Sequence, residues 1–173
     1  MLRTTIASAL MIVTAVVTGC GQPSTAGNDA AIASIDKAKF ILAEEPDEAV
    51  GVIIAREDAK DKDDIVLLGR IGGRKNPWID GRSAFMVIDA AMTVVADGTE
   101  SAEGEVCLDD CCAALRKDMT TLVKIVDEKG RTLPVDARKL FDLAENDMVV
   151  VKGKVQRDKD SFSVAATGFF VRK

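Results

Sequence analysis

The sequence contains no histidine and no tyrosine, and Trp78 is its only tryptophan. Without histidine the chain cannot use Ser-His-Asp or Cys-His catalysis, ligate a metal through imidazole, or carry a histidine pH switch. Its 28 acidic residues include no pair whose spacing marks it as a catalytic acid and base. The sequence therefore gives no positive sign of an enzyme, and we predict no catalytic residue.

Positive charge is in the minority, with 23 basic residues against 28 acidic ones and a formal net charge of −5. An acidic chain is a poor general binder of nucleic acid or of anionic lipid, so nucleic acid is not an expected partner. The length of 173 residues suits one domain with appendages. Beyond residue 20, no stretch is long and apolar enough to span a bilayer.

The first residues have the features of an export signal. Arg3 supplies a positive charge, and residues 6–17 form an apolar run too short to span a bilayer with ease. The sequence Val-Thr-Gly-Cys that ends at Cys20 resembles the bacterial lipobox, in which the signal is cut before the cysteine and that cysteine carries the lipid. An ordinary signal peptide with a chance cysteine, or an uncleaved anchor, is the alternative.

The lipobox resemblance implies an exported protein that begins at Cys20 and faces the periplasm. Several acyl chains on one cysteine anchor a protein stably, so the membrane becomes a partner without any spanning helix. Gly21, rather than aspartate, follows the cysteine. In the enterobacterial sorting pattern this favours the outer membrane over the inner one.

Strand patterns dominate the chain from residue 65 onward. Two apolar runs flank a segment that holds three glycines and Pro77, which predicts a strand, a long loop and a second strand. Lys129 and Gly130 end a turn between two further strands, and Gly168 in the last strand suggests a bulge. The predicted strands are residues 65–71, 83–88, 120–126, 131–135, 148–156 and 161–171.

Three short helices are expected. The first covers residues 35–42, and the second begins at Pro46 and ends in the charged segment 56–64. The clearest covers residues 136–144, where Asp136 is the N-cap and apolar residues recur at helical spacing. Asn146 can take the left-handed conformation after this helix.

A single helix between the third and fourth strands of a small β unit is the topology of an OB-fold. The residues resemble that family as well. VLLGRI followed by Arg74, Gly81-Arg82, Ala84-Phe85 and Ile88-Asp89 is similar to the opening strands of OB-fold domains, and DMVVVKGKVQRD is similar to their fourth strand and turn. The chain also resembles uncharacterised lipid-anchored bacterial proteins that share GRIGGRKNPW and a downstream cysteine cluster.

The resemblance implies a mainly β fold, an OB-like barrel of five to six strands with one helix between strands 3 and 4, preceded by short N-terminal helices. It covers about residues 65–172. The expected organisation is a signal peptide (1–19), a lipidated cysteine and flexible tether (20–29), a helical N-terminal segment (30–64) and the barrel (65–173), with a cysteine-bearing insertion at 90–119.

OB-folds bind ligands on the face of strands two and three, helped by the adjoining loops. Here the first such loop concentrates basic residues around the only tryptophan, and a cation beside an aromatic ring suits stacking of a sugar, a base or a peptide. The alternative is that the tryptophan caps the barrel end while the basic side chains face solvent. The candidate ligand-binding residues are Arg70, Arg74, Lys75, Trp78 and Arg82.

The second candidate site is the cysteine cluster Cys107, Cys111 and Cys112. Export makes a disulfide the default for cysteines, and Cys107 with either of the other two is the expected pair, leaving one thiol over. The alternatives are a thiolate site for Cu(I) or Zn(II), to which Asp109 or Asp110 would lend charge, and a redox-active dithiol. No other cofactor is expected.

These patterns together predict a lipid-anchored binding module of the cell envelope. The sequence does not identify its ligand, and an envelope protein, a peptide and a glycan are the candidate partners. The alternative is an envelope thiol protein that holds copper or zinc, or exchanges disulfides, through the cysteine cluster. The two readings differ in the residues that matter, since one depends on the loop around Trp78 and the other on Cys107.

Overall fold

The computed structural model describes residues 32–95, 105–108 and 112–172. The predicted signal peptide, the lipidation site Cys20, the tether and Cys111 lie outside these residues, so the predictions about them are not addressed by the structure. Within the described ranges, no helix has the length and apolar character needed to cross a membrane.

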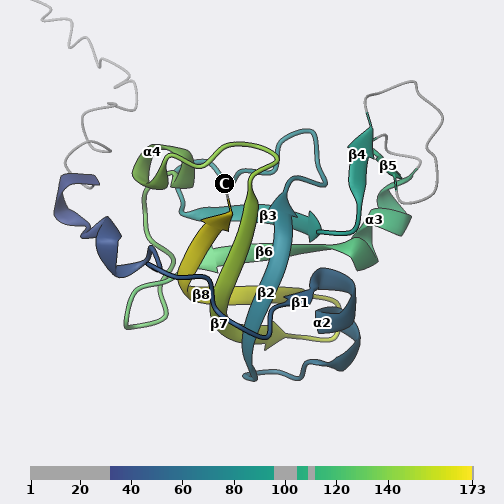
Figure 1. Cartoon of the computed structure of the whole chain (residues 1–173), viewed down its shortest axis with the longest axis horizontal. Coiled ribbons are helices and arrows are strands. Elements are labelled where there is room, and N and C mark those ends of the chain that lie inside the picture. Colours follow the sequence, from purple (N-terminus) through teal and green to yellow (C-terminus); the bar gives the residue numbers. More distant parts are fainter. Residues whose placement is uncertain (1–31, 96–104, 109–111, 173) are drawn as a thin grey trace, which may run out of the picture.

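Short helices and eight strands make up the described fold (Figure 1). The helical elements are η1 (Lys37–Lys39), α2 (Val52–Asp58), α3 (Ala113–Met119) and α4 (Ala137–Phe141). The strands are β1 (Val50–Gly51), β2 (Asp64–Ile71), β3 (Ala84–Asp89), β4 (Thr93–Val95), β5 (Glu105–Cys107), β6 (Thr120–Ile125), β7 (Met148–Arg157) and β8 (Phe162–Arg172).

Five of these strands close into a barrel. Their order is β2-β3-β6-β8-β7, and β2 also pairs with β7, which completes the circle. The pairing of β6 with β8 is parallel and the other four pairings are antiparallel. With α4 between β6 and β7, this order gives an OB-like barrel, so the predicted fold class is confirmed. The short β1 adds one strand beside β2.

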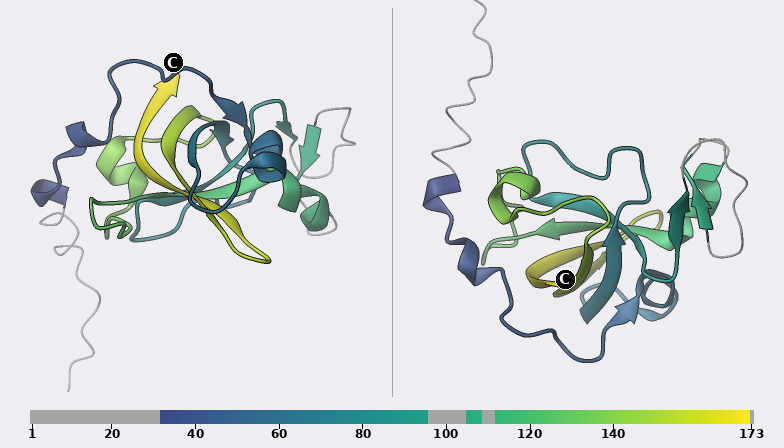
Figure 2. Two further views of the ribbon diagram at one scale, coloured as in Figure 1. Left: turned by 90° about the horizontal axis from the view of Figure 1, so that it is seen from below. Right: turned by 45° about the horizontal axis from the view of Figure 1, so that its top comes forward.

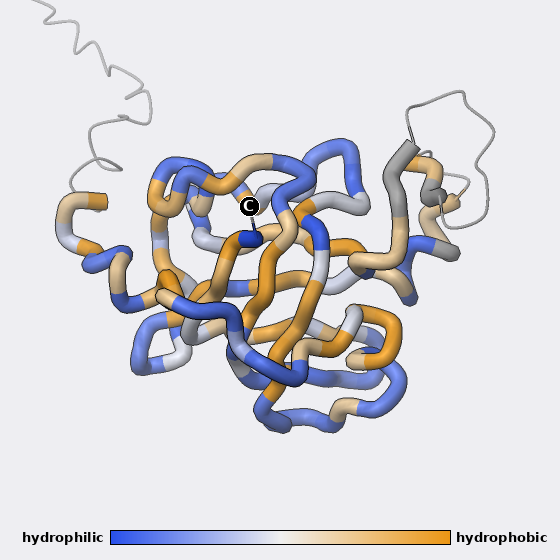
Figure 3. Tube along the Cα trace, viewed as in Figure 1, coloured by the Kyte–Doolittle hydropathy of each residue, from blue (hydrophilic) through white to orange (hydrophobic). Residues whose placement is uncertain are grey.

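Alternating side chains explain why the barrel strands form. Along β2, every second residue from Ile65 to Ile71 is buried, and the residues between them are partly exposed. Along β7 the same alternation runs from Val151 to Gln156, whereas Val149, Val150 and Val151 are buried in succession. Figure 3 shows hydrophobic residues along the barrel strands and hydrophilic ones in most of the connections. The largest buried side chains of this core include Phe85, Phe169, Leu67, Ile71 and Ile125.

A bulge in β8 bends the long β7–β8 pair. Lys152 pairs with Gly168 and Gly153 with Ala166, which leaves Thr167 as the extra residue. The predicted bulge is therefore present, one residue before Gly168. Such a bulge increases the local twist and helps a sheet to close on itself.

Residues 35–42 do not form the predicted helix. Only η1 is helical, with the Asp36 side chain accepting a hydrogen bond from the Ala38 backbone N–H. The chain then runs along β8 as an extended segment, in which Leu42 donates to the Phe169 carbonyl and Phe169 donates to the Phe40 carbonyl, both at 2.8 Å. The end of β8 extends beyond its pairing with β6, so its backbone groups on that side need other hydrogen-bond partners. Pairing with this edge is stronger than the weak helical preference of the segment.

The second predicted helix begins six residues later than Pro46. Residues 50–51 form β1 beside β2, and α2 then places Val52 and Ala55 in the core. Gly51, the N-cap of α2, offers no capping side chain. Asp89 at the end of β3 supplies the cap instead, because its Oδ2 accepts a hydrogen bond from the Ile53 N–H at 2.9 Å.

The segment 131–135 is not a strand, although the turn before it has the predicted glycine at positive φ, Gly130. Val126 and Thr132 form a single bridge. The chain then turns toward the start of β3, where Ser83 donates hydrogen bonds to the carbonyls of Leu133 and Val135. These contacts replace a continued hairpin.

The third predicted helix is confirmed at its start and is shorter at its end. Asp136 caps α4 by accepting a hydrogen bond from the Arg138 N–H at 3.0 Å. Asp142, rather than Asn146, takes the left-handed position directly after the helix, although Asn146 also has positive φ. The helix covers one end of the barrel, where Leu140 and Phe141 are buried.

Replacing Asp136 by alanine is expected to lower the free energy of unfolding by about 1–2 kcal/mol at neutral pH, because α4 loses its cap and the ion pair between the buried Asp136 and the exposed Arg138. The hydrogen bonds from Arg138 hold the pKa of Asp136 below its ordinary value. The stabilisation is therefore present above about pH 4 and is lost as pH falls through the folded-state pKa. Urea titrations followed by Trp78 fluorescence at several pH values measure both effects.

The matched control is Asp80→Asn, which removes the exposed partner of the same arginine at 3.0 Å. We expect this exposed pair to contribute less than about 0.5 kcal/mol. An equal loss from both substitutions, or a difference between wild type and Asp136→Ala that grows in acid, contradicts the prediction.

The described parts of the insertion between β3 and β6 project from one end of the barrel (Figures 1 and 2). These parts are β4 and β5, which pair in parallel, and α3, which leads directly into β6. At the opposite end of the barrel lies α4. Part of α3 lies beside the outer face of β3 and β6, where Arg116 and Lys117 line a groove with Met86 and Leu122.

Candidate functional site

A groove of about 770 Å³ runs over the outer face of β3 and β6, and we call it the basic groove. Its walls come from the loop between β2 and β3, from α3, from α2 and from the turn between β7 and β8. The lining residues are Arg56, Gly73, Arg74, Lys75, Ile79, Met86, Leu108, Ala113, Arg116, Lys117, Thr120, Thr121, Leu122, Asp160, Ser161 and Phe162.

The floor of the basic groove is aliphatic. Met86 on β3 and Leu122 on β6 lie directly opposite each other in the antiparallel ladder, and both are half-buried. Opposite residues on one face of such a ladder have their Cβ atoms about 5 Å apart, so the two side chains form one continuous surface. Leu108 and the exposed Ile79 extend this surface toward the rim.

The first wall is the loop between β2 and β3, whose backbone at Gly73 lies close to the side chain of Thr120 on β6. Gly73 has a φ of 81°, and a Cβ at this position would lie 2.6 Å from Cγ2 of Thr120. Only glycine combines this backbone conformation with this contact. The loop therefore lies against β6 and presents the exposed Arg74 and Lys75 at the groove.

Hydrogen bonds to the backbone hold the second wall. Arg116 is buried, and its Nη1 donates to the Cys107 carbonyl at 2.5 Å, which ties α3 to β5. Thr120 Oγ1 donates to the Arg116 carbonyl at 2.8 Å. These contacts fix α3 relative to β6 and leave Lys117 exposed beside the groove.

Two arginines lie over one aromatic ring at the third wall. The Cζ atom of Arg56 is 5.4 Å from the centroid of Phe162 and that of Arg157 is 4.9 Å from it. Arg56 also donates to the Thr120 carbonyl at 3.2 Å. Burial lowers the pKa of Arg56, the nearby Asp118 raises it, and the repulsion of Arg157 lowers it again. Arginine stays charged under such shifts, so two positive charges meet here.

Five of the six charged side chains that line the described groove are positive, with Asp160 as the sixth. The whole chain has a net charge of −5, so the sign of the groove lining is opposite to that of the chain as a whole. A partly enclosed cleft lined by one sign of charge focuses the field and raises the local concentration of ligands of the opposite sign. The groove is therefore suited to an anionic ligand.

Two of the five predicted ligand-binding residues, Arg74 and Lys75, line the groove. Trp78 does not, because it is only 9% exposed and belongs to the core. Its ring lies 5.9 Å from that of Phe85, and the Arg138 guanidinium covers it at 5.5 Å. This position agrees with the alternative prediction, in which the tryptophan caps the barrel end. The ring has no open face on which a ligand could stack.

The other two predicted residues lie away from the groove. Arg70 is on β2, where its Nη1 donates to the Asn146 carbonyl at 3.4 Å. Arg82 is exposed at the far end of the loop, just before β3. Neither lines the basic groove. Their contribution to ligand binding stays a prediction.

The cysteine cluster is only partly described. Cys107 ends β5 and Cys112 precedes α3, and both are half-buried. Cys111 lies outside the described residues, so the pairing of the three cysteines, the copper or zinc site and the dithiol all stay predictions. Among the described residues, no group of three or more cysteine, aspartate or glutamate side chains is placed to hold a metal ion.

Three basic residues of the groove have no signal in the sequence that marks them as site residues. They are Arg56, Arg116 and Lys117. Arg56 stands at the start of a highly charged segment, which the pattern assigns to solvent. Arg116 and Lys117 follow the cysteine cluster in an insertion without a sustained period. Their proximity depends on where α2 and α3 pack, and no spacing in the sequence encodes it.

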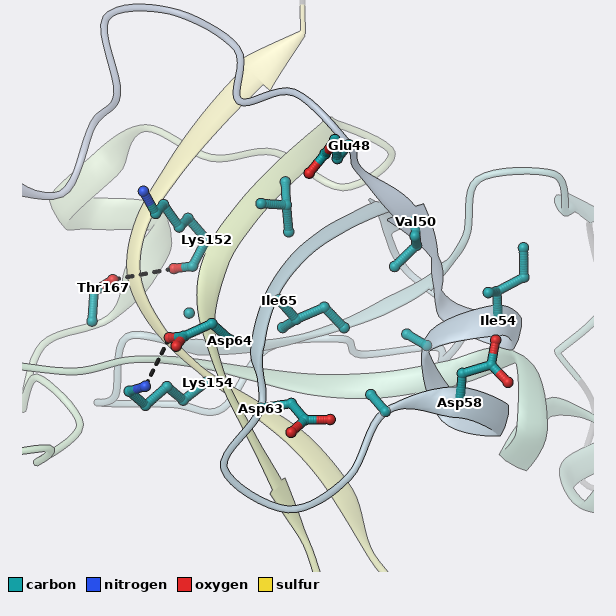
Figure 4. Close-up of a pocket in the computed structure, with 14 residues that line it drawn as sticks. Glu48, Val50, Ile54, Asp58, Asp63, Asp64, Ile65, Lys152, Lys154 and Thr167 are labelled. Carbon is teal, nitrogen blue, oxygen red and sulfur yellow. Dashed lines mark hydrogen bonds and ion pairs between the residues drawn. The ribbon is translucent and has the colours of Figure 1, made fainter.

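A second cavity of about 590 Å³ lies on the other side of α2, over β2 and β7 (Figure 4). Its charge is mostly of the opposite sign, because it is rimmed by Glu48, Asp58, Asp63 and Asp64 as well as by Lys152 and Lys154. Lys154 donates to Asp64 at 2.8 Å, and both side chains are exposed. We do not assign a ligand to this cavity.

The basic groove occupies the place where OB-folds bind their ligands, since β3, β6 and the adjoining loop correspond to strands two and three and the loop that precedes them. This correspondence rests on the strand order and the pairings alone. Comparisons with protein-family models, curated proteins and solved structures find no match for this chain.

Proposed function

We propose that the protein is a binding module of the cell envelope, held at a membrane by a lipid on Cys20, that takes an anionic ligand in the basic groove. The observation that carries this proposal is the collection of five basic side chains on one face of an acidic protein. They come from three separate segments and border an aliphatic floor on the face that OB-folds use for binding.

The membrane part of the proposal rests on the sequence. Arg3, the apolar run 6–17 and the lipobox-like residues ending at Cys20 support export and lipidation. The outer membrane is the proposed location, because Gly21 follows the cysteine. Retention of radiolabelled palmitate by the wild-type chain and its loss in Cys20→Ser tests this part independently of any ligand.

The binding part is tested by reversing the charge of two exposed groove residues. We expect Arg74→Glu combined with Lys117→Glu to weaken the binding of polyglutamate, used as a generic polyanion, by about tenfold or more. The measurement is titration calorimetry of the full chain in nanodiscs of phosphatidylcholine, which add no net charge. Binding by the wild type should weaken as salt is raised.

The matched control is Lys139→Glu combined with Lys129→Glu. It changes the net charge by the same amount, and both positions are exposed outside the groove. The proposal requires this variant to bind like the wild type. Equal weakening by the two double variants, or no measurable binding of the polyanion by the wild type, counts against the basic groove as the binding site.

A further inference from the structure

The aromatic rings of the described structure restrict the class of ligand that the basic groove can take. Phe162 is the only aromatic residue among the described groove residues, and it is 7% exposed. Arg56 and Arg157 both lie over its ring. Trp78 belongs to the core and is covered by Arg138. No aromatic face on the described part of the groove is therefore open for stacking.

This absence separates the groove from sites for bases and sugars. Proteins that bind single-stranded nucleic acid stack successive bases on open aromatic rings, and each stacked base contributes about 1–3 kcal/mol. A groove without an open ring lacks that contribution. A ligand here must obtain its affinity from charge and from aliphatic contacts.

The groove offers aliphatic contacts beside its cations. Met86 and Leu122 form the floor. Ile79 at the rim is 42% exposed, and few other large apolar side chains of the described residues are exposed. Methionine is flexible and polarizable, and it adapts to aliphatic groups of different shape. A bare polyanion, such as a polyphosphate, would leave this apolar floor unused.

The cations are suited to carboxylates. Three of the five are arginines, whose planar guanidinium matches a carboxylate or a phosphate in a bidentate pair, so the aliphatic floor is what distinguishes the two anions. Arg56 and Arg157 repel each other across one ring, and Asp118 is the acidic side chain that offsets the effect on Arg56. A carboxylate that enters this end of the groove would reduce the repulsion.

We infer that the ligand of the basic groove is an acidic peptide segment with aliphatic side chains, carried by a partner protein. This inference rests on the proposed function and names the class of its ligand. Glutamate or aspartate side chains pair with the arginines and lysines of the walls, and leucine, isoleucine or valine side chains lie on Met86 and Leu122. The fold itself places the two kinds of contact side by side.

The test uses the full chain in phosphatidylcholine nanodiscs and labelled probes in fluorescence anisotropy, with empty nanodiscs to correct for partition into lipid. The probes are an alternating glutamate-leucine peptide, an alternating glutamate-serine peptide of the same length and charge, and single-stranded oligothymidylate. We expect the glutamate-leucine peptide to bind about tenfold more tightly than either of the others.

Two polar substitutions of similar size, Met86→Gln and Leu122→Gln, separate the contribution of the aliphatic floor to peptide affinity from the contribution of the basic side chains. The double variant should lose about tenfold in affinity for the glutamate-leucine peptide and should bind the glutamate-serine peptide as the wild type does. Trp78 fluorescence and circular dichroism verify that the variant is folded. The Arg74→Glu and Lys117→Glu variant should weaken both peptides.

The outcomes distinguish this inference from the proposed function. If oligothymidylate or the glutamate-serine peptide binds as tightly as the glutamate-leucine peptide, and if Arg74→Glu with Lys117→Glu abolishes that binding, the peptide class is wrong while the anion-binding groove stands. If the glutamate-leucine peptide shows no binding up to about 1 mM, the inference fails. If no anionic probe binds, the proposed function fails with it.

Discussion

Replacing Gly153 by alanine is expected to lower the free energy of unfolding by about 3 kcal/mol or more. A Cβ at this position would overlap the carbonyl oxygen of Ala165 and would lie 2.8 Å from Cα of Ala166. Both are backbone atoms of β8, so neither can rotate away as a flexible side chain could. Relief requires β7 and β8 to separate, at the bulge where their register shifts.

The effect is large because β7 occupies a central place in the barrel. It pairs with β8 on one side and with β2 on the other, and the β2–β7 pairing closes the barrel. A displacement at Gly153 is therefore transmitted to both neighbours. Urea unfolding followed by the fluorescence of Trp78, the only tryptophan, measures the loss, and the thermal midpoint should fall by about 10 °C.

Gly130→Ala provides the control for the steric part of this prediction. Gly130 has a φ of 74°, but no atom lies within 4 Å of a Cβ placed there. Alanine at this position meets only the cost of the left-handed conformation, which is about 1 kcal/mol. If Gly153→Ala is no more destabilising than Gly130→Ala, the close approach of β7 and β8 does not limit the side chain at Gly153.

The barrel itself could be predicted from the sequence, because its strands carry their own pattern. Alternation along residues 65–71 and 148–156 predicts strands with one buried face, and the structure has β2 and β7 there. The cap of α4 at Asp136 is also a local signal. A single helix between the third and fourth strands then limits the topologies that remain. These inferences depend only on near neighbours in the chain.

The N-terminal segment could not be predicted in the same way. The spacing of Ile35, Ala38 and Leu42 is compatible with a helix, but the segment meets the open edge of β8 and pairs with Phe169. Glu45 then binds Arg172 near the end of β8, with both carboxylate oxygens 3.0 Å from Nε. Arg172 lies 127 residues away in the sequence. A local pattern contains no information about such a partner.

The candidate site was predictable only where one loop carries it. Arg74 and Lys75 belong to the glycine-rich loop and were predicted, whereas Arg56, Arg116 and Lys117 reach the groove through the packing of α2 and α3. For Trp78 the sequence pattern suggests a ligand-binding residue, because an aromatic ring in a basic loop is typical of a surface on which ligands stack. In the structure the ring belongs to the core. Its burial against Phe85 depends on the barrel core, which the loop sequence does not reveal.

The helix α2 connects the stability of the barrel to the basic groove. Its buried face packs into the core through Val52 and Ala55, and its exposed end carries Arg56 to the groove. No side chain of its own caps its first turn. The cap comes from Asp89, which is buried at the end of β3. The position of Arg56 therefore depends on a carboxylate that does not line the groove.

Replacing Asp89 by alanine is accordingly expected to lower the free energy of unfolding by about 3 kcal/mol. Its two carboxylate oxygens accept hydrogen bonds from the Ile53 and Ala91 N–H groups, both at 2.9 Å. Alanine leaves both donors without these acceptors. Gly51 fits against the same carboxylate, since a Cβ there would lie 2.6 Å from Oδ2. Hydrogen exchange of the Ile53 amide should accelerate more than exchange in β7.

The loss should extend to binding. Once α2 is no longer held at its first turn, Arg56 is displaced from Phe162 and Thr120. We expect Asp89→Ala to weaken binding of the glutamate-leucine peptide about threefold to tenfold under conditions where the variant is still folded. Asp64→Ala, which removes an exposed carboxylate paired with Lys154, should change neither property. Unchanged exchange at Ile53 in Asp89→Ala, with wild-type affinity, would show that α2 keeps its position without this cap.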